Sequence, residues 1–350
     1  MDVRAWLDGA NAEFSKNFVA FHDARVSLRR AQIVVMHCSD GRININNICR
    51  MIPGIITPVA DIGGKFDLGQ RSLSKILKRI RSYAESKGQK MIGLVTFHYD
   101  STEERFLREE RKLCCAGWQH DTESALKSAF MMAEKIRYIF DVYALVVGID
   151  TRTGSLRLFR ESHSNSDVLD VGSLPLGLDE KGIEKILNAF YSGCKTADAS
   201  FALAPVISGN QRHIADVKTN GNGSLFHDER AVFLSSTIDH LPDIGLKIAP
   251  FSSDLDGALN TAAKILRHNL LADARPKVVG FHPGKKVFIF ASSEYVEGDR
   301  IERKLAGEEA IYLLKRGQEI IEKSQPSLAG STEAIPFVTC LNTRRIEILS

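Results

Sequence analysis

One short stretch constrains this chain more than any other: the residues from Ile33 to Arg42, IVVMHCSDGR. Its first residues, Ile33 to Met36, are apolar and mostly β-branched, which predicts a buried strand. Three chemically active side chains, Cys38, Asp40 and Arg42, follow at once. Because ligands of open α/β sheets bind outside the carboxyl ends of the strands, the stretch predicts an α/β fold with a functional edge.

These three residue types at this spacing can build a metal site. Cys38, as a thiolate, is a ligand that zinc accepts. Asp40 lies two residues further along an extended chain and can face the same side. Arg42 can then hold the carboxylate of Asp40 in a bidentate ion pair. A buried structural cysteine beside a surface Asp–Arg turn is the alternative interpretation.

A second apolar stretch also ends in a metal-binding side chain. Residues 91–97 predict a strand, and His98 follows it. Further on, the adjacent thiols of Cys114 and Cys115 precede a pattern that predicts a helix from residue 122. Two thiolates and one imidazole from separate elements suit a catalytic zinc site, which leaves one coordination position open to water.

Taken together, these motifs resemble those of the β-class carbonic anhydrases. The stretch CSDGR resembles that family's Cys-x-Asp-x-Arg motif. A strand and glycine turn at 58–64, a helix at 71–86 and the strand ending in His98 follow in the family's order, so that the resemblance covers residues 30–160. The resemblance implies a β-carbonic-anhydrase-like sheet with flanking helices, Zn²⁺ as cofactor, and hydration of carbon dioxide to bicarbonate.

The resemblance also assigns a role to each candidate residue. It implies that Cys38, His98 and Cys115 bind zinc and that Asp40 and Arg42 are catalytic. A zinc-bound hydroxide would attack carbon dioxide, and Asp40 would orient that hydroxide by accepting its hydrogen bond. Arg42 would keep Asp40 ionised. If Arg42 released it, Asp40 could itself ligate zinc and close the site.

The chain departs from the family's pattern at two positions. Gly41 stands where the family usually has serine. The family's third ligand follows its histidine as His-x-x-Cys, but here the residue three positions after His98 is a serine. We interpret residues 101–114 as an insertion, after which Cys115 resumes the family's pattern as the third ligand. Cys114 is the alternative ligand.

The second half of the chain repeats the order of elements in the first. A strand pattern at 230–236 parallels that at 30–36, and a strand, turn and strand at 337–349 parallel residues 145–158. Two unrelated α/β segments are the alternative. We expect three segments in a fused pseudo-dimer: a metal-binding domain at 1–205, a linker at 206–228 and a degenerate repeat at 229–350.

The degenerate repeat should lack the metal ligands. Counting along the paired patterns sets Ile238, His240 and Pro242 near the positions of the Cys-x-Asp-x-Arg motif, and Ala291 opposite His98. The helices expected at 2–30 should pack on a neighbour, and by resemblance they would embrace the partner subunit. An ordinary amphipathic cap is the alternative interpretation.

Composition excludes several classes of partner. The net charge is +3, from 46 basic and 43 acidic residues, which is too balanced to indicate nucleic acid or an anionic membrane. No apolar run approaches the roughly 20 residues that span a bilayer, and no secretory signal is expected. Six cysteines in 350 residues do not indicate a disulfide framework. We therefore expect a cytoplasmic protein with a small-molecule substrate, able to assemble as a homo-oligomer of pseudo-dimers.

Three other functions fit the same residues. The zinc site could hydrolyse carbon disulfide or carbonyl sulfide, which would require a narrow apolar tunnel. The zinc could instead be structural, in a non-catalytic assembly module, a hypothesis that the insertion favours. Finally, Cys38 could be a nucleophile with His37 or His98 as its base. Neighbours on a strand point to opposite faces, so His37 should face away from Cys38.

Overall fold

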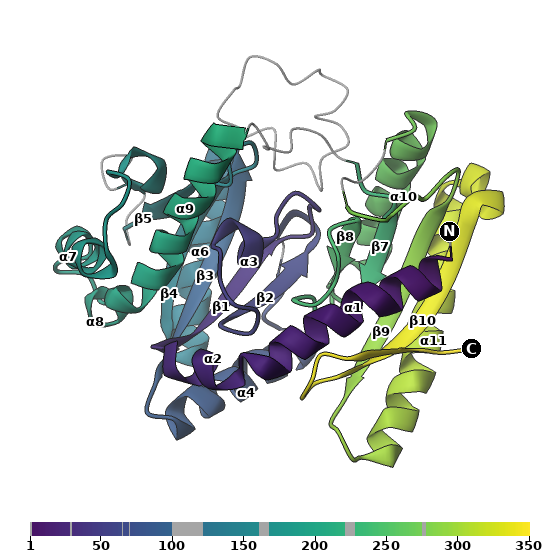
Figure 1. Cartoon of the computed structure of the whole chain (residues 1–350), viewed down its shortest axis with the longest axis horizontal. Helices are drawn as coiled ribbons and strands as arrows, with labels where there is room; N and C mark the ends of the chain where they lie inside the picture. Colours follow the sequence, from purple (N-terminus) through teal and green to yellow (C-terminus); the bar gives the residue numbers. More distant parts are fainter. Residues whose placement is uncertain are drawn as a thin grey trace.

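In the residues that the structure, a computed structural model, describes, two β-sheets are flanked by helices (Figure 1). The described residues are 2–28, 30–64, 66–69, 71–99, 122–160, 168–220, 228–274 and 278–350. None of the helices in these ranges combines the length and the apolar composition that a membrane span requires.

The first sheet has six strands in the order β2-β1-β3-β4-β5-β6. They are β1 (Ala31–Cys38), β2 (Ile56–Asp61), β3 (Lys90–Tyr99), β4 (Tyr143–Asp150), β5 (Leu156–Phe159) and β6 (Val168–Asp170). The strands from β2 to β4 are parallel, and β5 and β6 pair antiparallel. β1 is buried along its whole length, as its apolar, β-branched residues predict.

The second sheet has five strands in the order β11-β10-β9-β7-β8. They are β7 (Ala231–Leu234), β8 (Gly245–Ile248), β9 (Val287–Tyr295), β10 (Thr332–Cys340) and β11 (Ile346–Ile348). The strands from β8 to β10 are parallel, and β11 pairs antiparallel with β10. The edge strands β2 and β8 lie next to each other where the two sheets meet.

Helices fill the connections between the strands. In the first half they are α1 (Val3–Ala20), α2 (His22–Leu28), α3 (Ile45–Ile48), α4 (Arg71–Ser86), α6 (Thr122–Phe140), α7 (Glu180–Phe190) and α8 (Ala197–Ser200). They continue with α9 (Ala204–Asn220), α10 (Leu255–Leu271) and α11 (Arg300–Ser324). The described residues also include the short 3-10 helices η1 (Ile62–Gly64), η2 (Val171–Ser173), η3 (Phe201–Leu203) and η4 (Pro326–Ser331).

The two halves have the same topology, which confirms the prediction of an α/β fold with two repeats. Read from the edge, β8-β7-β9-β10-β11 matches β2-β1-β3-β4-β5, with the same parallel and antiparallel pairs. α4 and α10 occupy the same connection, as do α6 and α11. One hydrophobic cluster includes residues of both sheets, so the repeats share a core.

One sequence-based expectation about the arrangement of the elements needs correction. Much of the expected linker at 206–228 is helical, because α9 extends over residues 204–220. Its buried apolar residues, among them Val206, Ile207 and Ile214, pack it against the first half. This packing favours a helix at 204–220, and the turn-forming residues follow only after its end.

Each half extends one helix onto the other. α1 precedes the first sheet but packs on β11 of the second. α9 precedes the second sheet but packs on α3, α7 and η2 of the first. Figure 1 shows both helices lying across the half that they do not precede. The helix exchange is the arrangement that the resemblance implies for the N-terminal helices.

A buried asparagine anchors each exchanged helix. Asn210 of α9 accepts a hydrogen bond from the Leu156 N–H at 3.2 Å and donates one to the Gly154 carbonyl at 2.8 Å. Asn11 of α1 makes the same two bonds, at 2.8 Å and 2.9 Å, to the first residue of β11 and to the Arg344 carbonyl. The same contact therefore joins the halves twice.

Candidate metal centre

Two of the three expected metal ligands lie at the same edge of the first sheet. Cys38 ends β1 and His98 is the penultimate residue of β3. β1 and β3 are adjacent parallel strands, with Met36 opposite Val95, so both side chains reach their carboxyl ends. Cys38 is buried, and His98 is half-buried.

The third expected ligand falls outside the described residues. Cys115, its alternative Cys114 and the proposed insertion at 101–114 all lie between residues 99 and 122. Among the residues that the structure describes, no group of three histidine, cysteine or acidic side chains is arranged to hold a metal ion. The described edge therefore contributes two donors, a thiol and an imidazole, which belong to the set that zinc prefers.

Asp40 and Arg42 form the bidentate pair that their spacing predicts. The Nε of Arg42 lies 2.9 Å from Oδ1 of Asp40, and its Nη2 lies 2.6 Å from Oδ2. The backbone N–H of Arg42 also donates to Oδ1 at 3.0 Å. The side chain of Asp40 is fully buried and that of Arg42 is 3% exposed. Such a charge pair is strongly oriented because water competes for neither partner.

His37 is bound by the backbone and not by the neighbouring thiol. Its Nδ1 lies 2.7 Å from the Cys38 carbonyl oxygen, and because that oxygen can only accept, Nδ1 carries the proton. Burial lowers the pKa of His37 to about 4, so its imidazole is neutral at neutral pH. The hypothesis of a Cys38 nucleophile activated by His37 gains no support from this geometry.

Asp61 is a residue of this edge that sequence reasoning did not single out. It ends β2, directly opposite Cys38 in the register of the two strands. Burial raises the pKa of Asp61 to about 7, although hydrogen bonds from the Ile62 N–H and from Ser252 oppose the shift. Its position as the first charged residue after the apolar residues of a strand was the available signal.

A cavity of about 510 Å³ opens beside Arg42. It is lined by the loop at 41–44, the β4–β5 turn at 150–154, and His213 and Val217 of α9. Asp228 and Asp243 also line it. The lining mixes charged side chains such as Arg42 and Asp150 with apolar ones such as Ile43 and Ile48, and so differs from the narrow, purely apolar tunnel that carbon disulfide hydrolysis would require.

Matching hydrogen bonds align the two halves residue by residue. The β4–β5 and β10–β11 turns make the same backbone bonds, including one to the tyrosine that ends the neighbouring strand, Tyr99 or Tyr295. The strand registers extend this match to β1 and β7. The resulting pairs are Cys38 with Ser236, Asp40 with Ile238, Arg42 with His240, and His98 with Glu294.

This alignment corrects the one counted from the sequence. The counterparts of the Cys-x-Asp-x-Arg motif lie two residues earlier than counted, so Pro242 has no part in them. Glu294, and not Ala291, is opposite His98. The counting failed because a shift of a few residues leaves the apolar pattern of a buried strand unchanged, so the pattern does not fix the register.

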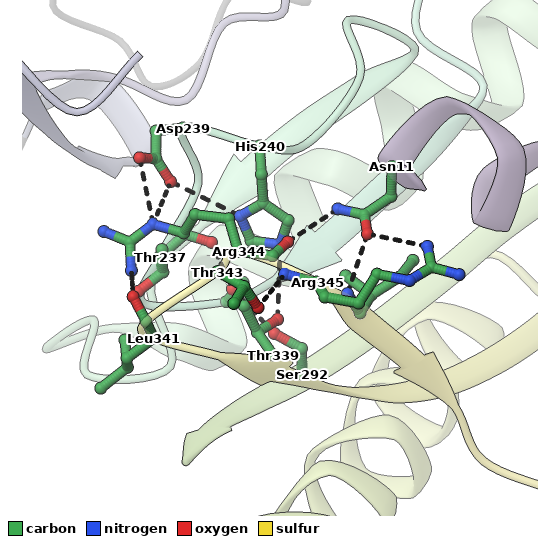
Figure 2. Close-up of polar contacts among 12 residues, drawn as sticks. Asn11, Thr237, Asp239, His240, Ser292, Thr339, Leu341, Thr343, Arg344 and Arg345 are labelled. Carbon is green, nitrogen blue, oxygen red and sulfur yellow. Dashed lines mark hydrogen bonds and ion pairs between the residues drawn. The ribbon is translucent and has the colours of Figure 1, made fainter. Parts of the chain in front are cut away.

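The second half fills the space that is open in the first. Asp239 and Arg344 occupy the positions of Gly41 and Gly154, and their Oδ1 and Nε atoms lie 3.1 Å apart (Figure 2). His240, at the position of Arg42, lies with its Nε2 3.3 Å from a threonine hydroxyl. A buried ion pair therefore stands where the first half has two glycines.

The side chains of the exchanged helices α1 and α9 add to this difference between the filled space of the second half and the open space of the first. Phe14 of α1 lies 6.3 Å from the His240 ring, and Phe18 lies 5.2 Å below the Arg344 guanidinium. With Asn11 matched to Asn210, the equivalent positions on α9 carry His213 and Val217, which are smaller. The first half therefore keeps a cavity beside its Asp–Arg pair, whereas side chains occupy the corresponding space in the second half.

Comparison with known proteins gives likenesses in structure only. No protein-family model matches the chain, and no curated protein matches it. Among solved structures, the chain is similar to the β-carbonic anhydrase CafA of the fungal pathogen Aspergillus fumigatus, at 13% sequence identity and a TM-score of 0.28. The match covers 51% of this chain and 92% of that chain. At this identity and TM-score the likeness carries no argument about the activity, which has to be inferred from the residues of this chain.

Proposed function

We propose that this protein is a zinc-dependent lyase that hydrates carbon dioxide to bicarbonate. The observation that carries the proposal is the buried ion pair of Asp40 and Arg42 beside Cys38, on the same sheet edge as His98. A lone structural cysteine would not need an oriented, desolvated carboxylate next to it, and burying such a pair costs free energy that a stable fold alone does not require.

The donors at this edge fit zinc. We propose that Cys38 and His98 bind it together with Cys115, and that residues 1–205 contain the whole site. When bound by three protein ligands, zinc lowers the pKa of a coordinated water towards about 7. The second repeat has Ser236 and Glu294 at the corresponding positions, so we propose one zinc per chain.

Asp40 and Arg42 act on the attacking water through one carboxylate. Arg42 engages both oxygens of Asp40 from one side, which keeps the carboxylate ionised and fixes its direction. The oriented carboxylate of Asp40 can then accept a hydrogen bond from the attacking water and direct it towards carbon dioxide. Without Arg42, the carboxylate would be released to compete with water for the metal.

The test is stopped-flow hydration of carbon dioxide, with zinc content measured in each variant. Arg42→Ala should lower the rate by about 100-fold or more while zinc stays bound, since removing one preorganised donor has an effect of that order. The control is Arg316→Ala, which removes an arginine from an exposed ion pair of the second half and should leave the rate unchanged.

Two outcomes would refute the proposal. Equal rates for wild type and Arg42→Ala would remove the ion pair from the mechanism. A wild-type protein that is fully loaded with zinc but inactive would favour the non-catalytic assembly module. The same preparation can be tested with carbonyl sulfide, which separates the hydrolase from both.

A further inference from the structure

A glutamate of the second half contacts the turn that joins the candidate catalytic residues. Glu229 lies just before β7 and is 2% exposed. Its Oε1 accepts a hydrogen bond from the backbone N–H of Gly41 at 3.0 Å, across 188 positions of sequence. Gly41 lies between Asp40 and Arg42, so this bond acts on the peptide that sets their relative orientation.

The glutamate is itself held in place. Asn269 of α10 is buried, and its Nδ2 donates to the backbone carbonyl of Glu229 at 2.9 Å and approaches Oε2 at 3.4 Å. A second contact crosses from the same half, since the Lys247 N–H of β8 donates to the Ser39 carbonyl at 3.2 Å. The degenerate repeat therefore holds the turn at two backbone positions, one on each side of Asp40.

Glu229 explains why residue 41 is glycine. The backbone of Gly41 does not have a positive φ, so its conformation alone does not require glycine. A Cβ at this position would lie 2.8 Å from the Cγ of Glu229 and 3.0 Å from its Oε1. A serine, which the resembled family usually has here, would displace the carboxylate. The glycine and the glutamate thus form one structural unit.

The second half shows what replaces this unit where no active site remains. Asp239 occupies the position of Gly41 and is paired with Arg344. The residue at the position of Asp40 is Ile238, which has no carboxylate to orient. The glycine that admits a carboxylate from the other half therefore occurs in the repeat that has the Asp–Arg pair.

We propose that Glu229 is a positioning residue for the Asp40–Arg42 pair, supplied by the degenerate repeat. This inference rests on the proposed function and assigns the degenerate half a role in it. By fixing the Gly41 peptide, Glu229 keeps the carboxylate of Asp40 directed at the attacking water and away from the metal. A displacement of about 1 Å in such a group has large effects on rate.

The first arm of the test measures hydration kinetics and zinc content. Glu229→Ala should lower kcat by about tenfold or more, with zinc content unchanged. Glu229→Gln retains an oxygen that can accept from the Gly41 N–H, so it should restore most of the activity. Equal losses in both variants would show that the hydrogen bond is not what matters, and the proposal would fall.

The second arm does not depend on activity. In the cobalt-substituted protein, Glu229→Ala should change the visible spectrum if Asp40 moves to the metal, and adding Asp40→Asn should reverse that change. An unchanged spectrum would mean that Asp40 keeps its orientation without Glu229, which contradicts the proposal.

The third arm uses metal-free protein and urea unfolding. Gly41→Ser should lower the urea midpoint in the wild-type background, because its side chain collides with Glu229. In the Glu229→Ala background, where the space is vacant, the same substitution should have little effect. Additive effects would refute the pairing of residues 41 and 229. If this coupling is found but the zinc-loaded wild type is inactive, the proposed function fails and the contact between the halves stands.

Discussion

Replacing Asn210 should test whether the exchanged helices hold the two halves together. Asn210 is fully buried and makes three hydrogen bonds to backbone groups of the first half: to the Leu156 N–H, and to the carbonyls of Ile48 and Gly154. With about 1 kcal/mol for each net hydrogen bond, Asn210→Ala should lower the free energy of unfolding by about 3 kcal/mol.

The aspartate variant gives a sharper result. Asn210→Asp keeps the acceptor for Leu156 but loses both donated bonds, and it directs a carboxylate oxygen at the carbonyl oxygens of Ile48 and Gly154. Because an unsatisfied buried charge costs more than a missing polar group, Asn210→Asp should be more destabilising than Asn210→Ala. A variant that merely lost packing volume would give the opposite order, since aspartate is nearly isosteric with asparagine.

The assay is urea unfolding followed by circular dichroism, with two reference variants. Asn11→Ala removes the equivalent anchor and should cost a similar amount, while Asn342→Ala removes an exposed residue that accepts a single hydrogen bond and should cost well under 1 kcal/mol. If Asn210→Ala lowers the free energy of unfolding by less than about 0.5 kcal/mol, the range of ordinary surface changes, α9 is not an anchor.

Three further results are expected. Gly209→Ala should destabilise the protein far more than Gly330→Ala, as measured by thermal unfolding, because a Cβ at 209 would overlap the Cys49 carbonyl oxygen whereas one at 330 meets nothing within 4 Å. Burial lowers the pKa of His240 below its usual 6.5, with Asp239 opposing the shift, so the unfolded chain binds a proton that the folded protein excludes. The free energy of unfolding should therefore fall as the pH drops below 6.5. In metal-free His240→Asn the loss of unfolding free energy between about pH 7.5 and about pH 5 should be smaller than in the wild type, and an equal loss would contradict this prediction. Cys115→Ser should abolish zinc binding while Cys114→Ser retains it, by metal analysis, and the reverse result would make Cys114 the third ligand.

The local patterns of the sequence were sufficient for the α/β class and for most elements. The β-branched stretch at 33–36 became the buried centre of β1, and the helical periodicity at 71–86 became α4. The spacing of Asp40 and Arg42 predicted their ion pair, because two residues in one turn have few ways to meet. Such features depend on neighbours in sequence, which propensity and periodicity describe well.

Features that depend on distant residues could not be predicted in this way. Apolar burial made residues 206–220 helical, although the turn-forming residues beyond them favoured a linker. The true counterparts of His98 and Asp40 emerged only from the pairing of strands. A shift of a few residues leaves the apolar pattern of a fully buried strand unchanged, so the sequence alone does not specify that register.

The contact between Glu229 and Gly41 is the clearest case of what tertiary structure alone decided. In the sequence, Glu229 is an ordinary acidic residue that precedes a strand, and Gly41 is a mild departure from the Cys-x-Asp-x-Arg motif of the resembled family. Only the packing of two repeats brings them together, so that a side chain at position 41 would collide with Glu229. Short-range chemistry can be read from residue order, but steric exclusion between segments 188 positions apart arises only once both have folded.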